Sequence, residues 1–404
     1  MILPRISLKN LLRQNASYEL DGNADINSAA KLIFGLLEKH SFVILTDLEE
    51  NMTTAHDLFT AEFTDFLQDT SAEVKKECVG PIYCNQRQIP LWFVGYEKQK
   101  ARESFRMPTQ KYNPASGHNY IDNTKWPNEK FKQAHQELAN HMKEVTDFLF
   151  HLFLSTGRAK TDGTNKTNID AAAAVAAADA GALSNTSTSE YDFDASLLRL
   201  SDKFTDSVAE DLSVFHSFNY PNTYEDGFRP ELPGILLKEH KDQSLFVAEF
   251  APKVSGLQVY DLYSEQYILV EDLCDYGKEL IVFAGQGIED LILGINTPYK
   301  IHACKHRVIE NLNHSRMCFL FEQKYKSYLS LGTSFVRQRN EKLQKEQEQG
   351  QEYKTEEEKV YVDNHSTSMD AYYRQLMAAC DEDESSSDDN LQCHDDNDNS
   401  SRLL

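Results

Sequence analysis

The chain has 404 residues, of which 40% are hydrophobic, and 22 Phe and 19 Tyr among them are typical of a globular protein with a sizeable core. Its net charge of −23 repels phosphate backbones and anionic lipid headgroups, so we expect neither nucleic acid nor a membrane as a partner. The seven scattered cysteines lack a C-x-x-C pair, and no secretory signal or apolar run of about 18 residues is present. These features predict a soluble cytoplasmic protein, with the nucleus as the alternative.

The first 156 residues are expected to form an accessory region of helical or mixed structure. Apolar residues recur at helical spacing over 27–40, and the next segment, 41–46, is typical of a strand. Two further helices are predicted over about 53–69 and 127–155. We expect these helices to support a sheet.

Residues 157–190 differ sharply from their surroundings. Gly, Thr, Asn and Ser flank a run of alanines at 171–178, and such a composition offers little to bury besides methyl groups. The sequence therefore predicts a disordered insertion between the accessory region and the strand-rich segment of the chain.

Short apolar or alternating runs separated by turn residues fill the segment 212–322. Strands are predicted over 214–218, 235–239, 245–250, 257–260, 268–271, 280–283 and 317–321. Regular short strands of this kind favour a sandwich or a barrel.

The last part of the chain becomes steadily more polar. A C-terminal helix is predicted over 326–348, and an acidic disordered tail over 349–404. From residue 339 onward there are 7 Lys and Arg against 18 Asp and Glu, so about half of the net negative charge lies in this short stretch. A solubilising tail is its ordinary interpretation.

Two potential metal ligands come directly after the apolar strand at 235–239. His240 and Asp242 are separated by one residue, and side chains at i and i+2 leave a strand on the same face. An H-x-D pair alone is weak evidence, because a chain with 13 His and many Asp can contain one by chance.

A third ligand is expected from a distant strand, and His306 precedes a β-compatible segment. His302 and His314 are the alternatives, but neither is followed by Arg-Val as His306 is. Two imidazoles and one carboxylate leave adjacent positions open on a metal, which suits iron(II) oxygen chemistry, whereas zinc favours a closed tetrahedron.

Several short motifs occur in a fixed order around these ligands. They are Phe218-Asn-Tyr-Pro, the H-x-D pair, Gly256-Leu-Gln-Val, Phe283-Ala-Gly-Gln, His306-Arg-Val and then Arg316, ten residues after His306. In this order the segment 212–325 resembles the isopenicillin N synthase-like family of Fe(II)/2-oxoglutarate-dependent dioxygenases. The likeness extends weakly to Gly95-Tyr96 and to Arg102-Glu-Ser-Phe105.

The resemblance implies a mainly β fold with flanking helices, a double-stranded β-helix (jelly-roll) barrel, with its dioxygenase core at 191–325. It also implies that Arg316, Tyr220 and Cys318 bind the cosubstrate 2-oxoglutarate. Two departures stand out: Cys318 occupies the place of a serine, and 64 positions separate Asp242 from His306 where fifty-odd are usual. A thiol is the weaker hydrogen-bond donor, and we attribute the extra length to turns around 262–266 and 294–299.

The function that the resemblance implies is oxidation of a small organic substrate, by hydroxylation or desaturation, with Fe(II), 2-oxoglutarate and O2, releasing succinate and CO2. No catalytic residue is expected beyond the metal ligands. Cys318 keeps open a 2-oxoglutarate-independent oxidase in which ascorbate or the substrate supplies electrons, and a silent barrel acting as a binding module is the third alternative. Arg87, Arg102 and Lys238 are candidates to meet an anionic substrate, with ordinary structural charge as the commoner role. The substrate and the oligomeric state do not follow from the sequence.

Overall fold

The computed structural model describes residues 4–13, 27–80, 83–84, 90–92, 94–99, 101–109, 112–113, 118–119, 124–158, 211–222, 234–295 and 297–348. The chain divides into two compact units. The first comprises residues 1–81 and 93–339, and the second comprises 82–92 and 340–404. All the residues of the candidate functional site belong to the first unit.

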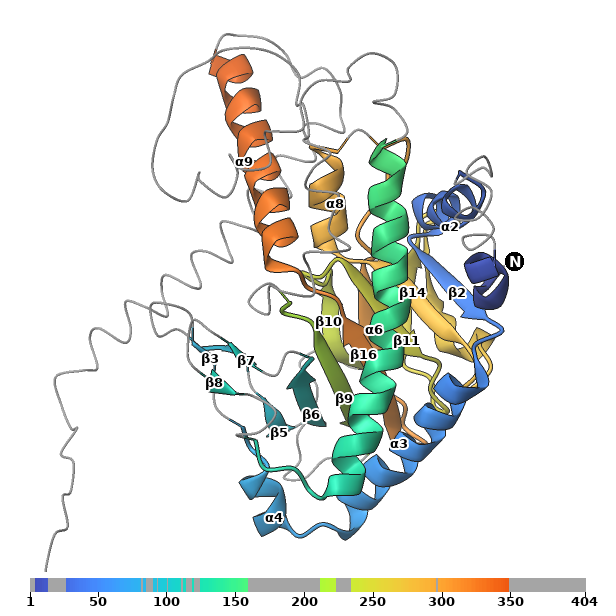
Figure 1. The fold of residues 1–404 in the computed structure, drawn as a ribbon, viewed down its shortest axis with the longest axis vertical. Coiled ribbons are helices and arrows are strands. Elements are labelled where there is room, and N and C mark those ends of the chain that lie inside the picture. The colour runs from blue at the N-terminus through green and yellow to red at the C-terminus, as the bar shows by residue number, and fades with distance from the viewer. Residues whose placement is uncertain are drawn as a thin grey trace, which may run out of the picture. The chain divides into compact units, whose positions relative to one another are not determined.

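An eight-stranded sheet forms the larger layer of the first unit (Figure 1). Its order is β1 (Arg5–Ser7), β2 (Phe42–Thr46), β14 (Leu280–Ala284), β11 (Phe246–Phe250), β16 (Arg316–Glu322), β9 (Val214–Tyr220), β6 (Arg102–Pro108) and β5 (Gly95–Gln99). Strands from the first 108 residues thus flank strands that lie far along the chain, and β6 pairs directly with β9.

A four-stranded sheet forms the smaller layer. Its order is β10 (Ile235–His240), β15 (His306–Ile309), β12 (Leu257–Asp261) and β13 (Gln266–Leu269). Buried residues of both sheets pack into common clusters, which places the core between the layers. One cluster includes Phe42, Val247, Leu257, Val259 and Ile281, and the other includes Phe218, Tyr220, Val308 and Cys318.

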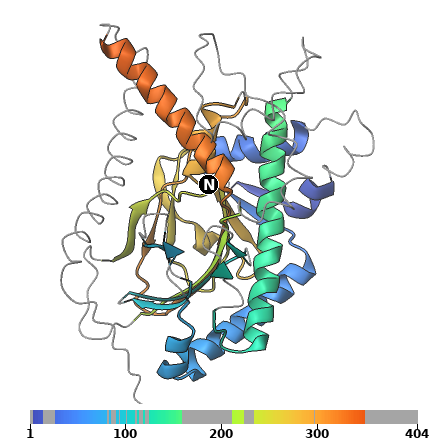
Figure 2. The same ribbon diagram turned by 60° about the vertical axis from the view of Figure 1, so that its left-hand side comes forward.

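Two helices, α3 (Glu50–Asp69) and α6 (Glu129–Arg158), cover the other face of the large sheet (Figures 1 and 2). Rings from α3 and α6 pack against Phe215 of β9 and Phe319 of β16, with centroid distances of 5.7 Å for Phe59–Phe215 and 4.9 Å for Phe59–Phe319. Because neighbouring residues of a strand point to opposite faces, Phe319 lies toward the helices while Cys318 lies toward the smaller sheet. The same alternation directs Arg316 toward the interior.

The remaining elements are short or terminal. In the first unit they are α2 (Asn27–His40), α4 (Ala72–Glu77), β7 (Tyr112–Asn113), β8 (His118–Asn119), a 3-10 helix (Val270–Leu273) and α8 (Gln286–Ile292). Helix α9 (Lys326–Glu348) begins in the first unit and ends in the second, which also contains β3 (Tyr83–Cys84) and β4 (Pro90–Trp92). Among the described helices none is long and apolar enough to cross a membrane.

The predicted strands and helices are confirmed, with differences of a few residues at their ends. Val270 and Glu271, which the sequence pattern assigns to a strand, lie in the 3-10 helix. Between Asp242 and His306 there is a turn at 262–265, as expected, and also helix α8, which was not expected. The insertion predicted at 157–190, apart from the end of α6, and the tail predicted at 349–404 lie outside the described residues.

Candidate metal and oxo-acid site

His240 and His306 are cross-strand neighbours. His240 ends β10, His306 begins β15, and the two are paired in the antiparallel register. Their ring centroids lie 4.2 Å apart. Two imidazoles from segments 66 positions apart are therefore brought together by strand pairing alone.

Asp242 completes the group from the turn after β10. Its carboxylate oxygens lie 3.4 Å from Nε2 of His240 and 3.5 Å from Nε2 of His306. One candidate ligand atom from each of the three residues lies within 4.8 Å of the others. Among the described residues no other group of three His, Cys, Asp or Glu side chains meets this condition.

The turn that carries Asp242 is held by the first turn of α8. The backbone amide of Gln286 donates to the carbonyl of Asp242 at 2.7 Å, and the amide of Gly287 donates to Ser244 at 2.9 Å. A Cβ at Gly285 would lie only 2.3 Å from the carbonyl oxygen of Ser244. Glycine at this position therefore allows the close approach that holds the backbone turn carrying Asp242.

Backbone carbonyls hold the two imidazoles in one tautomer. Nδ1 of His240 donates to the carbonyl of Lys238 at 2.8 Å, and Nδ1 of His306 donates to the carbonyl of Cys304 at 3.2 Å. Both Nε2 atoms face Asp242, and in a neutral imidazole with Nδ1 occupied in this way Nε2 carries the lone pair that a metal-binding histidine requires. Burial lowers the pKa of His306, while in His240 the nearby Asp242 outweighs burial and raises the pKa.

The alternative third ligands lie away from this group. His302 is exposed and contacts Glu289 at 3.4 Å, and His314 is exposed beside Asn311. His306 is therefore the histidine that the structure brings to His240 and Asp242. Whether the three bind a metal stays a prediction.

A cavity of about 220 Å³ lies between the two sheets and is lined at one end by His240 and Asp242. Arg316, Tyr220 and Cys318 also line it. Arg316 packs on Gly256, where a Cβ would lie 2.7 Å from Cδ of the arginine, and Gly256 neighbours Ile309 at the opposite end of β15 from His306. Arg316 therefore lies about 10 Å along the strand from His306, given the rise of a strand.

Arg316 is already engaged by two glutamate side chains. Its Nε donates to Glu271 at 3.1 Å, its Nη2 donates to Glu249 at 2.5 Å, and its Nη1 contacts Sγ of Cys318 at 2.9 Å. The side chain is only 3% exposed. Glu271 also accepts hydrogen bonds from the backbone amides of Gly256 and Leu257, at 2.6 and 2.8 Å.

The neighbours of Arg316 have shifted pKa values. Burial raises the pKa of Glu249, opposed by Arg316 and reinforced by Glu271, to about 8. Burial also raises the pKa of the Tyr220 phenol to about 12, although Arg102 and Arg316 oppose it. Both groups are thus protonated at neutral pH, and the Tyr220 hydroxyl can donate a hydrogen bond.

Sequence reasoning missed Glu249 and Glu271, and it misplaced Lys238. Glu249 is the one charged residue of the buried strand β11, which is a signal that could have been noticed. Lys238, one of the candidates to meet an anionic substrate, lies two residues before His240 but is exposed, because the pairing of β10 with β15 shifts register between Leu237 and His240. Arg87 lies outside the described residues.

No family model matches the chain, and no curated protein matches it. Among solved structures, a full-length Neurospora crassa protein in complex with alpha-KG and 5-formyluracil is similar at a TM-score of 0.50 and 16% identity, covering 80% of this chain and 85% of that one. The same protein with alpha-KG and thymine gives a TM-score of 0.50 at 15% identity, covering 80% and 86%.

A rice dioxygenase for auxin oxidation is similar at a TM-score of 0.49 and 13% identity, covering 80% of this chain and 83% of that one. The likeness to the Neurospora structures shows a shared fold. The chain has the double-stranded β-helix fold that the sequence predicts.

Proposed function

We propose that this protein is a non-haem Fe(II) and 2-oxoglutarate-dependent dioxygenase that oxidises a small organic substrate with O2 and releases succinate and CO2. The observation that carries the proposal is one cavity lined both by His240 and Asp242 of the His-Asp-His group and by a buried arginine and tyrosine. Membership of the isopenicillin N synthase-like family, suggested by the order of the motifs, belongs to the same proposal.

The residues of the His-Asp-His group fit iron. Their Nε2 atoms and a carboxylate converge, and each imidazole is fixed by a carbonyl at its other nitrogen. Bound iron would supply the site at which O2 is reduced while the oxo acid is decarboxylated. The protein's own task is to hold three ligands on one side and to leave the cavity side open.

The cavity fits an oxo acid that extends from the metal ligands toward Tyr220 and Arg316. Its apolar wall includes Leu257, Val308 and Leu320, which would exclude water from the middle of a short dicarboxylic acid. At the far end the Tyr220 hydroxyl can donate to a carboxylate, and Cys318 contributes a thiol where a hydroxyl would donate more strongly.

A small substrate is the class that this cavity supports best. Its volume of about 220 Å³ lies below the roughly 300–1,000 Å³ of pockets for drug-sized ligands. The Neurospora structures hold alpha-KG together with thymine or 5-formyluracil, and a small organic molecule is what we propose for this chain also. The expected absence of nucleic-acid partners and the cytoplasmic location remain predictions.

The proposal is tested by anaerobic titration of Fe(II) into the full chain, followed by 2-oxoglutarate, and then by succinate analysis in air. We expect iron binding, a weak visible absorption band on addition of the acid, and slow succinate formation. His306→Ala should abolish all three, and the matched variants His302→Ala and His314→Ala should behave like the unchanged protein.

The outcomes separate the alternatives. Iron binding without the band or succinate would favour an oxidase that does not use 2-oxoglutarate. No iron binding at all would contradict the enzyme proposal and favour a binding module. Loss of iron with His302→Ala in place of His306→Ala would refute the assigned ligand set.

A further inference from the structure

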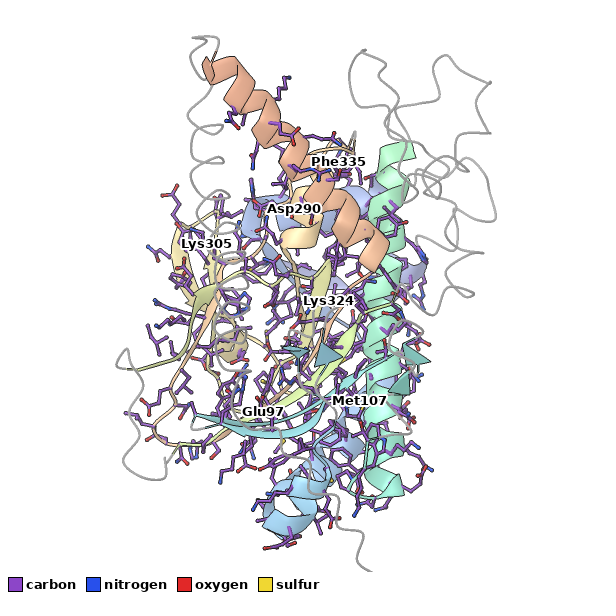
Figure 3. All side chains as sticks on the ribbon, turned by 90° about the vertical axis from the view of Figure 1, so that its left-hand side faces the viewer. Glu97, Met107, Asp290, Lys305, Lys324 and Phe335 are labelled. Atoms are coloured by element: carbon purple, nitrogen blue, oxygen red, sulfur yellow. The ribbon has the colours of Figure 1, made fainter. Side chains whose placement is uncertain are left out.

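Three arginines line the cavity, and they differ in what balances their charge. Arg316 is held by Glu249 and Glu271. Arg106 pairs with Glu97 of β5 at 2.8 Å, and Figure 3 labels Glu97 at this edge of the sheet. Arg102 has no carboxylate partner among the residues that the structure describes.

The contacts that Arg102 does make are to neutral groups. Its Nη2 donates to Oε1 of Gln99 at 3.2 Å, and its Cζ lies 4.7 Å from the ring centroid of Phe218. Its Nε is buried and makes no hydrogen bond in the described structure. A buried donor without a partner costs free energy, and an anion in the cavity would satisfy it.

Strand register places Arg102 beside the predicted carboxylate end of the cavity. Arg316 of β16 pairs with Tyr220 of β9, and Glu103 of β6 pairs with Asn219 of β9. Because β6 and β9 are antiparallel, this register places Arg102 opposite Tyr220. Arg316, Tyr220 and Arg102 therefore form one row on the inner face of the sheet. All three line the cavity.

The two guanidinium groups of this row differ in how far neighbouring acidic groups balance their positive charge. Two glutamates, Glu249 and Glu271, already accept hydrogen bonds from Arg316, and its remaining donor contacts Cys318. A second anion there would have to displace Glu249. No carboxylate in the described part of the chain balances the charge of Arg102, and a guanidinium suits a carboxylate because it can donate two parallel hydrogen bonds.

We infer that Arg102, together with the Tyr220 hydroxyl, binds the distal carboxylate of the oxo acid, while Arg316 anchors Glu249 and Glu271. The inference rests on the proposed function, because it names the residue that recognises the cosubstrate at that same site. The positive charge that recognises the distal carboxylate is then on Arg102 of β6 and not on Arg316 of β16. Strand β6 belongs to the first 156 residues, which the sequence predicts to form an accessory region.

The test compares two oxo acids that share the iron-binding head. The full chain is loaded anaerobically with Fe(II) and titrated, by the visible absorption band, with 2-oxoglutarate and with 2-oxobutyrate, which lacks the distal carboxylate. Arg102→Gln should raise the Kd for 2-oxoglutarate by about 10- to 100-fold and leave the Kd for 2-oxobutyrate within about 2-fold.

Two further variants control the result. Arg106→Gln removes the same charge from the same face of β6 and should change neither Kd by more than about 3-fold. Arg102→Lys keeps the charge without the fork and should have an intermediate effect on 2-oxoglutarate. Thermal unfolding and iron affinity are measured for each variant, so that loss of fold is not mistaken for loss of a contact.

The outcomes distinguish this inference from the proposed function. If both acids bind and Arg102→Gln weakens neither, or weakens both equally, the inference is wrong and the dioxygenase proposal stands. If neither acid perturbs iron in the unchanged protein, the proposed function fails and the inference fails with it. If Arg102→Gln does not fold, the Arg102→Lys titration and the comparison of the two acids in the unchanged protein decide, since equal affinities there would overturn the inference.

Discussion

The two ends of the cavity are built differently. At the metal end, His240, Asp242 and His306 are each held by nearby backbone, through the carbonyls of Lys238 and Cys304 and the amide of Gln286. At the other end, side chains from β16, β11 and a 3-10 helix hold one another, with Arg316 between Glu249 and Glu271. Local backbone can fix a side chain whatever lies across the cavity, whereas a network of buried charges depends on every member.

The largest effect is expected from breaking that network at Glu271. Glu271→Ala removes one of the two glutamates on Arg316 and the acceptor of two backbone amides, and removing one partner of a buried ion pair costs roughly 3–5 kcal/mol. Urea unfolding measures the loss. The adjacent exposed Asp272→Ala is the control, and a loss below about 1 kcal/mol at Glu271 would contradict the network.

The second-largest effect is expected on iron affinity, which should depend on the metal end of the cavity and not on the other end. Asp242→Ala should raise the Kd for Fe(II) more than about 100-fold, because a ligand is lost where even supporting contacts are worth 10- to 100-fold. Cys318→Ser, at the far end, should leave iron affinity within about 3-fold. Isothermal titration under nitrogen measures both, and equal losses would show that the ends are not independent.

The pH dependence of stability sharpens the comparison further. Because burial raises the pKa of Glu249 to about 8, the folded protein keeps a proton that the unfolded chain releases above about 4.5. This group's contribution is complete below the unfolded pKa and is lost as pH rises toward 8.

Glu249→Gln should therefore remove a decline of roughly 2 kcal/mol in unfolding free energy between pH 5.5 and 7.5. Urea unfolding at both pH values measures it, with the exposed Glu341→Gln as the matched control. An unchanged slope in Glu249→Gln would show that its carboxyl is ionised throughout this range.

The smallest effect concerns the thiol. Cys318→Ser replaces a weak donor with a hydroxyl, and we expect 2-oxoglutarate to bind about 2- to 10-fold more tightly. The absorption titration with iron present measures the change. Weaker binding would indicate that the sulfur contact to Arg316 positions the guanidinium better than an oxygen does.

Sequence was sufficient for the metal end and insufficient for the carboxylate end. The i, i+2 spacing, the Arg-Val after His306 and the order of the surrounding motifs together selected three residues that the structure brings together. The partners of Arg316 come from β11 and from the 3-10 helix, 67 and 45 positions away. Their meeting depends on strand order and register, which local patterns do not encode.

The strand pattern itself was predictable, since alternation and turn residues mark each strand. The missing element was α8, only seven residues long, because a short apolar run does not reveal its period. The sequence offered Arg102 only as one of three candidates to meet an anionic substrate, because local patterns do not show which arginine has a carboxylate partner in the fold.

Helix α8 contacts the Asp242 turn through backbone hydrogen bonds and supplies no ligand. Binding energy gained at Asp242 must nevertheless oppose the local opening of this helix, because opening breaks the bonds that hold the turn. Amide hydrogen exchange at Gln286 and Gly287 should therefore slow when Fe(II) binds, while exchange in α4 stays unchanged. A helix outside the coordination sphere would thus report whether the metal is present.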